Sequence, residues 1–293
     1  MISGVKAPVL RNEPLSKHTT FRIGGPADFF IEALDIADIQ KVISYAKENQ
    51  IDVFVLGSGS NVLFSDSGYR GIVLKLSDKV NIELSKETNI LTVNAGAPLA
   101  SVIKFCIDND LSGLETLAGI PSTVGGSIWM NASSKGAISD NLVSIKVIDE
   151  NANVKNLKKE EINFSYRKSD LLALIIIQAE FLLNKRDKEY IIKRHIDSIE
   201  EKKAKQPLDA FCAGCVFKNP ETSNVSAGEL IEKAGLKGFS IGGAQISKKH
   251  ANYIVNENDA TSDNVKNLIT HIKDKILKEH NIKLQEEILI VWV

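Results

Sequence analysis

The stretch VFVLGSGSN, residues 53–61, places a polar loop with two glycines directly after a short apolar run. The length and composition of residues 53–56 predict a buried strand. Glycines permit positive φ angles, and the backbone N–H groups of such a loop suit a pyrophosphate. An ordinary polar turn is the alternative, because the loop has neither the lysine of a P-loop nor the third glycine of a dinucleotide fingerprint.

A second glycine-rich segment, residues 119–126, follows further along the chain between apolar residues. Its Gly, Ser and Thr residues could approach the same ligand closely from another side. A buried turn that binds no ligand is the alternative for this segment.

Strand and helix patterns alternate around these two loops without an internal repeat. Short apolar runs predict strands, and apolar residues spaced by three and four predict helices. The expected strands cover residues 28–33, 53–56, 71–76, 91–95, 143–149, 174–183 and 288–292, and the expected helices begin near residues 39, 98, 187 and 261. This order indicates α/β or α+β layers, and the change in composition at Gln206-Pro207 predicts the start of a C-terminal domain.

The composition excludes several classes of protein. Hydrophobic residues make up 43% of the 293 residues, charged residues make up 25%, and the formal net charge is −1. These values exclude a disordered or collagen-like chain and disfavour a nucleic-acid binder. The longest apolar run, residues 171–177, is too short to cross a bilayer, and no signal-peptide pattern opens the chain. We therefore expect a cytoplasmic protein without a membrane partner.

Three cysteines are too few for a disulfide framework in a chain of this size. Cys106 falls on the apolar stripe of an expected helix, so we expect it in the core. Cys212 and Cys215 match Cys-x-x-Cys, which raises the alternatives of a dithiol redox centre or half of a zinc site. We predict no metal site, because the histidines show no spacing typical of ligands.

Three further segments combine residues with useful chemistry. Ser165-Tyr166-Arg167 offers a cation that can hold a carboxylate, and the segment 214–220 combines a thiol, a cation and an amide. Glu286-Glu287 offers carboxylates just before the last expected strand. A surface arginine, an ordinary loop and exposed glutamates are the alternative interpretations.

Taken in order, these segments resemble the UDP-N-acetylenolpyruvoylglucosamine reductase (MurB) family over nearly the whole chain. Each segment alone is a weak signal, and the specificity lies in the ordered set. The matching segments are residues 20–27, 56–63, 118–131, 164–167, 214–220, 230–238, 250–253 and 286–288. The resemblance implies an α+β fold with an FAD-binding unit of the vanillyl-alcohol-oxidase (PCMH) type. That unit would have two subdomains, residues 1–75 and 76–205, followed by an α/β substrate-binding domain, residues 206–293.

The resemblance also implies non-covalent FAD and, as co-substrate, NADPH. By position in the family pattern, the first glycine-rich loop would cradle the pyrophosphate, and the second would pack beside the flavin. The residues expected at the cofactor are Arg22, Gly57, Ser58, Gly59, Ser60, Asn61, Gly119, Ile120, Pro121, Ser122, Thr123, Gly125, Gly126 and Asn131.

In the family, NADPH reduces the flavin and is replaced by UDP-N-acetylglucosamine that carries an enolpyruvyl ether. A hydride from flavin N5 adds to the terminal carbon and leaves negative charge that spreads into the carboxylate. The resemblance implies that Arg167 and Glu287 stabilise this charge and that Cys215 protonates the carbanion, which yields UDP-N-acetylmuramate for peptidoglycan synthesis. The residues expected at the nucleotide sugar are Tyr166, Lys218 and Asn219.

The chain departs from the family pattern at three places. The usual proton donor is a serine, but a thiol, with a pKa near 8.5, is a stronger acid than an alcohol, so Cys215 can perform the same step. Leu289 stands where many members have an arginine, and residues 131–135 replace a run of small residues and tyrosine. The short spacing between Arg167 and Cys215 indicates the shorter subgroup of the family.

Two other functions remain open at this point. A flavin-dependent alcohol or sugar oxidase of the same fold would react rapidly with oxygen and would not respond to the UDP-sugar. A dithiol redox protein or a non-catalytic flavin-binding protein would not need Arg167 or Glu287.

Overall fold

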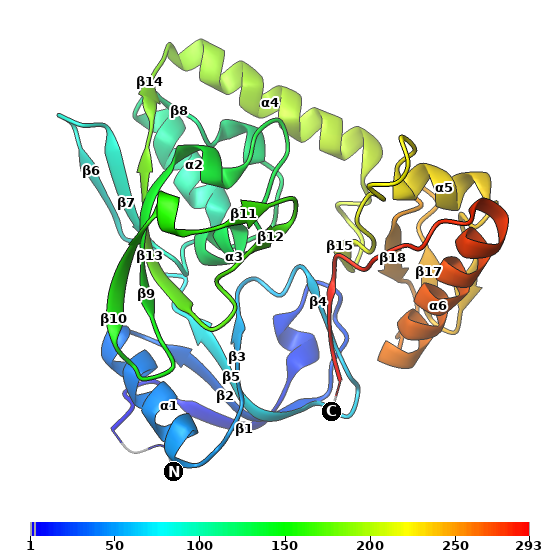
Figure 1. The fold of residues 1–293 in the computed structure, drawn as a ribbon, viewed down its shortest axis with the longest axis horizontal. Helices are drawn as coiled ribbons and strands as arrows, with labels where there is room; N and C mark the ends of the chain where they lie inside the picture. The colour runs from blue at the N-terminus through cyan, green and yellow to red at the C-terminus, as the bar shows by residue number, and fades with distance from the viewer. Residues whose placement is uncertain (1, 3, 293) are drawn as a thin grey trace. The chain divides into compact units, whose positions relative to one another are not determined.

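The computed structural model describes residue 2 and residues 4–292 (Figure 1). The chain divides into two compact units. The first unit comprises Met1–Leu10, Phe29–Ser58 and Gly71–Glu201, and the second comprises Arg11–Asp28, Gly59–Arg70 and Lys202–Val293. The three-part division at residues 75 and 205 stays a prediction. Among the described residues, no helix is both long and apolar enough to span a membrane.

The first unit contains a five-stranded antiparallel sheet in the order β10-β9-β13-β7-β6. Its strands are β6 (Ile82–Ser85), β7 (Ile90–Asn94), β9 (Leu142–Ile148), β10 (Val154–Lys158) and β13 (Ile175–Leu182). Figure 1 shows α2 (Leu99–Asp108) and α3 (Val124–Trp129) beside this sheet. Buried side chains of both helices and of the sheet, Val102, Val124 and Phe181 among them, form one apolar core.

Strand β13 separates two cores, because successive side chains of a strand point to opposite faces. Ile176 belongs to the core with α2 and α3, whereas its neighbours Ile175 and Ile177 belong to a second core. This second core includes the apolar face of α1 (Ile36–Glu48). The helix begins after Asp35, whose side chain accepts a hydrogen bond from the backbone N–H of Asp38.

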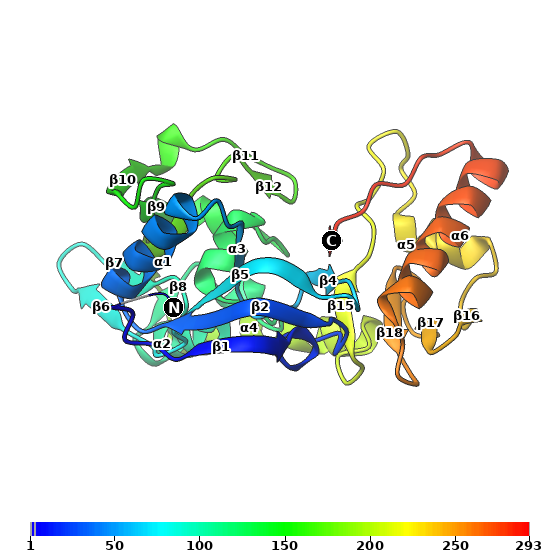
Figure 2. The same ribbon diagram turned by 90° about the horizontal axis from the view of Figure 1, so that it is seen from below.

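A second sheet has the order β1-β2-β5-β3. Its strands are β1 (Val9–Pro14), β2 (Pro26–Ala33), β3 (Val53–Leu56) and β5 (Tyr69–Leu76). Figure 2 shows β1, β2 and β5 side by side. Strands β3 and β5 are parallel, and the first glycine-rich loop leaves the carboxyl end of β3.

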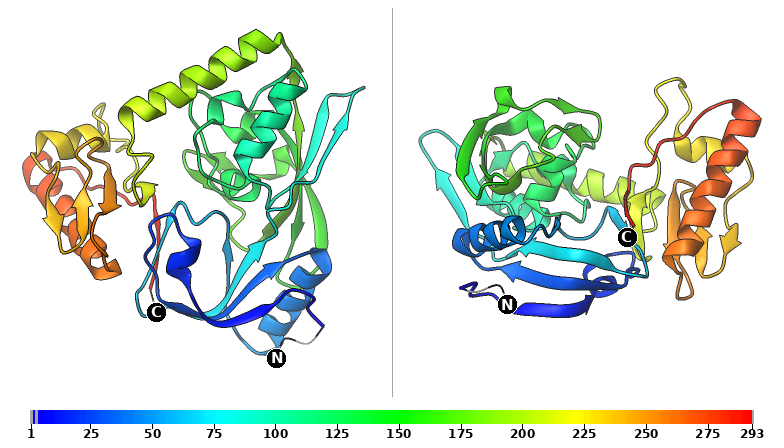
Figure 3. Two further views of the ribbon diagram at one scale, coloured as in Figure 1. Left: turned by 180° about the vertical axis from the view of Figure 1, so that it is seen from behind. Right: turned by 60° about the horizontal axis from the view of Figure 1, so that its bottom comes forward.

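The second unit contains an antiparallel sheet in the order β15-β18-β17-β16. Its strands are β15 (Cys212–Cys215), β16 (Ser240–Ile241), β17 (Ala244–Ile246) and β18 (Tyr253–Asn256). Figure 3 shows α5 (Ala227–Lys233) and α6 (Ser262–His280) packed beside these strands. In the same unit, β19 (Leu289–Val291) pairs in parallel with β4 (Val62–Phe64). The helices, the strands and this pair share one core.

Short elements and one long helix complete the described chain. The remaining strands are β8 (Leu111–Ser112), β11 (Phe164–Ser165), β12 (Lys168–Ser169) and β14 (Asn184–Lys185). The 3-10 turns are η1 (Leu15–His18), η2 (Glu115–Leu117), η3 (Ile138–Asn141) and η4 (Lys159–Glu161). The long helix is α4 (Lys188–Lys205).

The α+β class and all seven expected strands are confirmed, and Cys106 is 2% exposed in the core. The four expected helices are also present. The sequence patterns missed α3, because a six-residue helix that contains two glycines is too short for a periodic apolar pattern. They also missed β4 and the hairpin of β11 and β12, whose strands are only two or three residues long.

Candidate active site

In the first unit, the two glycine-rich loops lie against each other. A Cβ atom at Gly57 would stand 2.9 Å from Thr123 Oγ1, closer than side chains can pack without a shift. Thr123 is the N-cap of α3, and its Oγ1 accepts a hydrogen bond from Gly126 N at 3.2 Å. The contact requires a residue without a side chain at position 57. Gly57 and Thr123 are 66 residues apart in sequence, so their loops form one surface, which two independent turns would not do.

The second loop is held by the end of β7. The backbone N–H of Gly125 donates to Ala95 O at 2.8 Å, and a Cβ at Gly125 would stand 2.9 Å from the Ala95 side chain. Gly119 and Pro121 are exposed, and Ile120 and Ser122 are half-buried. The loop is thus anchored on one side and open on the other.

Asn131, shortly after α3, carries an unused acceptor. Its Nδ2 donates to Ser165 O at 3.0 Å, but its buried Oδ1 accepts no hydrogen bond from the described part of the chain. Buried polar atoms are nearly always paired, so this acceptor is available to a water or a ligand. Its φ of 45° is also in the left-handed region.

Arg167 stands at the tip of a hairpin. Tyr166 and Arg167 are the two residues between β11 and β12, which pair Ser165 with Lys168. Arg167 has a φ of 55°, an uncommon conformation for arginine that the tight turn imposes. Its Nη1 donates to Ser133 Oγ at 2.6 Å and to Ser133 O at 3.2 Å, and its guanidinium carbon lies 5.4 Å from the centre of the Tyr166 ring. The run 131–135, a departure from the family pattern, therefore supplies the acceptor that orients Arg167.

In the second unit, Gly59 of the first glycine-rich loop contacts η1 and the residue that follows it. A Cβ at Gly59 would stand 2.1 Å from His18 O, and its φ is 66°, so no other residue fits. Thr20 bridges this loop to β15, because its hydroxyl donates to Cys212 O at 2.6 Å and lies 3.3 Å from Gly59 O. The loop of residues 59–61 and the Cys-x-x-Cys strand are thus joined inside one unit.

Cys212 and Cys215 point to the same face of their sheet. Cys212 lies opposite Val255 and Cys215 lies opposite Tyr253, so three steps along β15 match two steps along β18. Gly214, with a φ of 77°, accommodates this bulge. Val255 and Tyr253 share a face because they are two residues apart, so their partners share it too. Burial raises the pKa of the Cys212 thiol.

The Cys-x-x-Cys motif therefore lies on a strand and does not open a helix, unlike a thioredoxin-like dithiol. No cluster of three or more His, Cys, Asp or Glu residues that could hold a metal occurs in the described ranges.

Backbone pairing places Glu287 opposite Val216, the residue that follows Cys215. The N–H of Glu287 donates to Val216 O at 2.8 Å, and the N–H of Lys218 donates to Gln285 O at 2.9 Å. Asn61 joins the same group, because its Nδ2 donates to Glu287 O at 3.2 Å. Leu289, two residues further, is half-buried in β19, and its N–H donates to Asn61 O.

Asn252 clamps the segment that follows Cys215. Its Oδ1 accepts from Phe217 N at 2.9 Å and its Nδ2 donates to Phe217 O at 2.8 Å, while Asn252 O accepts from Val216 N. Both partners are buried. Asn252 lies within the matching segment 250–253, but nothing in its sequence neighbourhood assigns it a role. Such a two-way clamp has no signature along the chain, because the partners are 35 residues apart.

The remaining predicted residues take separate positions. Lys218 is half-buried beside the clamp. Asn219 is exposed, and its Oδ1 accepts from Ala227 N at 3.1 Å, so at least part of its side chain supports α5. Arg22 is exposed, has a φ of 55°, and holds its guanidinium carbon 3.7 Å from the centre of the Phe211 ring. Phe211, an exposed aromatic residue, was not expected at the site.

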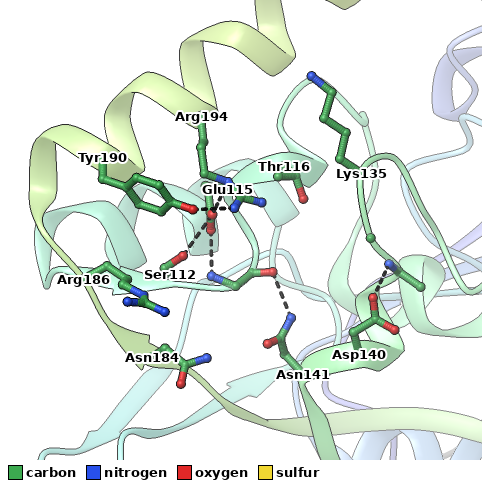
Figure 4. Close-up of a pocket in the computed structure, with 13 residues that line it drawn as sticks. Ser112, Glu115, Thr116, Lys135, Asp140, Asn141, Asn184, Arg186, Tyr190 and Arg194 are labelled. Carbon is green, nitrogen blue, oxygen red and sulfur yellow. Dashed lines mark hydrogen bonds and ion pairs between the residues drawn. The ribbon is translucent and has the colours of Figure 1, made fainter.

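A pocket of about 260 Å³ in the first unit contains none of the predicted residues (Figure 4). At its centre, Glu115 accepts from Ser112 Oγ at 2.9 Å and from Gly113 N at 2.6 Å, and it pairs with Arg194 of α4 at 3.0 Å. The buried carboxylate is fully satisfied by these partners. The cluster thus ties α4 to η2 and explains the position of the helix.

Three comparisons place the chain among known proteins. A family model described as UDP-N-acetylenolpyruvoylglucosamine reductase, C-terminal domain, matches residues 206–291, and a model described as FAD binding domain matches residues 27–158. The UDP-N-acetylenolpyruvoylglucosamine reductases of Bacillus pumilus and Caldanaerobacter subterraneus are each 40% identical to the chain. The aligned regions cover 97% and 96% of this chain and 94% and 92% of the relatives.

Solved structures agree with the sequence comparisons. The crystal structure of the reductase (MurB) from Thermus caldophilus matches 98% of this chain and 100% of its own with a TM-score of 0.83 and 32% identity. BBE-like 1 from Physcomitrella patens matches 63% of this chain and 43% of its own with a TM-score of 0.50 and 14% identity, which shows a shared fold alone.

Proposed function

Because the chain belongs to the UDP-N-acetylenolpyruvoylglucosamine reductase family, we propose that it reduces the enolpyruvyl ether of UDP-N-acetylglucosamine to UDP-N-acetylmuramate with NADPH. The chain is an FAD-dependent oxidoreductase of peptidoglycan precursor synthesis. We place the reaction in the cytoplasm. The observation that supports the mechanism is the backbone pairing that joins the segment after Cys215 to the segment that contains Glu287.

The two glycine-rich loops fit an FAD. Gly57 and Gly59 stand where a side chain would collide with Thr123 and with His18 O, so the backbone itself forms the surface. Asn131 Oδ1 is a buried acceptor that a ligand can use. The residues that would hold the cofactor are Arg22, residues 57–61, the loop 119–126 and Asn131. When FAD is bound, it supplies hydride transfer between NADPH and the enolpyruvyl group.

Arg167 and Glu287 serve the charge that develops on the substrate. Arg167 presents a planar cation that can hold a carboxylate in two hydrogen bonds, and Ser133 orients it through Nη1. Glu287, if protonated, donates a hydrogen bond to the same carboxylate. Tyr166, Lys218 and Asn219 would contact the nucleotide sugar.

Cys215 gives a proton to the carbanion carbon. The half-buried Cys215 is held by the backbone of its strand. An ordinary thiol, with a reference pKa near 8.5, is mostly protonated at neutral pH and can supply the proton that this step consumes. The pairing of residues 216–218 with 285–287 supports this assignment, because it joins the segment after Cys215 to the segment that carries Glu287.

An anaerobic visible spectrum tests the proposal. Bound flavin should bleach on addition of NADPH and regain its colour on addition of the UDP-enolpyruvyl sugar. Colour that returns only with oxygen would indicate an oxidase instead. The glycine-rich loops contain neither His nor Cys, so heat or acid should release all the yellow colour from the precipitated chain.

A further inference from the structure

Tyr253 of β18 lies directly opposite Cys215 of β15. Side chains that face each other in an antiparallel pair project on the same side, with Cβ atoms about 5 Å apart. A side-chain hydrogen bond with Cys215 is among the causes that raise the pKa of Tyr253. Tyr253 is 7% exposed, and its backbone N–H and O bond to His250 O and Ser247 N at 3.0 and 2.8 Å. The register of β15 and β18 therefore holds the Tyr253 side chain beside the Cys215 side chain.

The groups around the phenol come from three segments. Cys215 lies opposite Tyr253, and Cys212 shares the same face of the sheet. Glu287, in the segment before β19, acts on the phenol electrostatically, and the His250 ring lies 5.0 Å away in an edge-on arrangement. Burial, followed by the effects of Cys215, Cys212 and Glu287, raises the pKa of Tyr253. The phenol therefore keeps its proton where a thiol loses one, and against a thiolate it acts as a donor.

The charged residues that act on His250 complete this environment. Glu232, Lys237 and Lys205 interact with the imidazole, and burial is the largest cause of its lowered pKa. His250 is thus neutral through most of the pH range in which the thiol titrates, so it adds no charge beside Tyr253 there.

We propose that Tyr253 positions Cys215 and stabilises its thiolate when Cys215 protonates the substrate. This inference rests on the function proposed above. In the step, the S–H bond breaks, a C–H bond forms at the carbanion carbon, and the electron pair of the S–H bond stays on sulfur. The Tyr253 O–H donates a hydrogen bond to the thiolate until water returns the proton. Hydrogen bonds to charged groups are stronger than those to neutral groups, so Tyr253 favours the charged sulfur.

The test compares the alkylation of Cys215 by iodoacetamide over a range of pH in two holoenzymes, Cys212→Ala and Cys212→Ala/Tyr253→Phe. The Cys212 change removes the neighbouring thiol, and mass spectrometry of the Cys215 peptide gives the rate. Only the thiolate reacts, so the pH of half-maximal rate reports on its stabilisation. We expect Tyr253→Phe to raise this pH by about one unit.

Tyr69→Phe in the Cys212→Ala background is the matched control. Tyr69 lies in the second unit, and its ring contacts Phe64 at a centroid distance of 6.4 Å. This variant should leave the alkylation profile unchanged. An unchanged profile in the Tyr253→Phe variant, at full FAD content, would overturn the inference.

The kinetic readout separates this inference from the proposed function. In an otherwise unchanged chain, Tyr253→Phe should slow flavin reoxidation by the UDP-sugar about tenfold and leave reduction by NADPH unchanged. Equal slowing of both half-reactions would indicate a structural role and overturn the inference. If Cys215→Ala reoxidises as fast as the unchanged chain, the proposed proton donor is wrong, whereas the alkylation profile still tests the hydrogen bond.

Discussion

The fold holds Arg167 in one way and holds Cys215 and Glu287 in another. Arg167 stands on a two-residue turn, and its side chain is oriented by Ser133. Cys215 and Glu287 lie next to segments that are hydrogen-bonded to each other. A long, flexible arginine side chain can reach its target from a strained turn, and its planar guanidinium carries several donors. A thiol has one rotatable bond, so only the backbone can place it for proton transfer.

Removal of the thiol should give the largest effect. Cys215→Ala leaves no proton donor and should slow flavin reoxidation by about a thousandfold, within the usual range for general acid catalysis. Cys215→Ser should retain useful activity, because it places a hydroxyl on the same strand. Stopped-flow traces of both half-reactions measure this, and reduction by NADPH should be unaffected. Equal rates in the Ala and Ser variants would contradict the role of this side chain.

Substitutions of the charge-stabilising residues Arg167 and Glu287 should give the second-largest effect. Arg167→Lys and Glu287→Gln should each slow reoxidation by about 100-fold to 1000-fold, because both residues act on charge that appears only after hydride transfer. Reduction by NADPH, recorded in the same instrument, is the internal control. A variant that slows reduction as much as reoxidation would show that its residue holds the cofactor and not the substrate.

A stability measurement contrasts the two kinds of support. Asn252→Ala leaves the buried N–H and C=O of Phe217 without partners and should lower the free energy of unfolding by about 2–4 kcal/mol. Ser133→Ala removes one acceptor of Arg167 while Ser133 O remains, so it should cost about 1 kcal/mol or less. Urea unfolding monitored by circular dichroism compares them. A larger loss of unfolding free energy in Ser133→Ala than in Asn252→Ala would refute the proposed difference between the support of Arg167 and the clamp on Phe217.

The smallest expected effect is on the pH dependence of stability. Burial lowers the pKa of His250 below its usual 6.5, and its Nδ1 accepts a hydrogen bond from Asn252 N at 3.2 Å that protonation would remove. As the pH falls, the unfolded chain therefore binds this proton before the folded chain does. The contribution of neutral His250 to stability is complete above pH 6.5 and declines as the pH falls through the lowered pKa of the folded state. Melting temperatures between pH 7.5 and 5 should fall less steeply in His250→Gln than in the unchanged chain.

His195 in the first unit is the comparison for that measurement. Burial also lowers its pKa, with an opposing effect of Glu115. His195→Gln should reduce the slope with pH as well, but it should leave the clamp of Asn252 on Phe217 intact. Identical pH slopes in both variants and in the unchanged chain would show that neither histidine is responsible.

Periodicity and composition allowed much of the fold to be predicted. The strand of residues 53–56 has its predicted bounds, and α6 begins at Ser262, directly after the expected Thr261. These elements carry strong local signals, an apolar run before glycines and a threonine cap before an apolar stripe. The hairpin that presents Arg167 was missed, because its two-residue strands leave no alternation to detect.

The sequence by itself determined the α+β class, the ordered set of family segments and the residue types available for catalysis. Only the tertiary structure decided which of them meet: that Gly57 abuts Thr123, that Ser133 orients Arg167, and that Tyr253 faces Cys215. The physical reason is that local signals act over one turn or one strand, whereas these contacts depend on strand register and loop packing between distant segments. A single bulge at Gly214 turns Cys212 to the same face as Cys215, and no spacing rule along the chain predicts it.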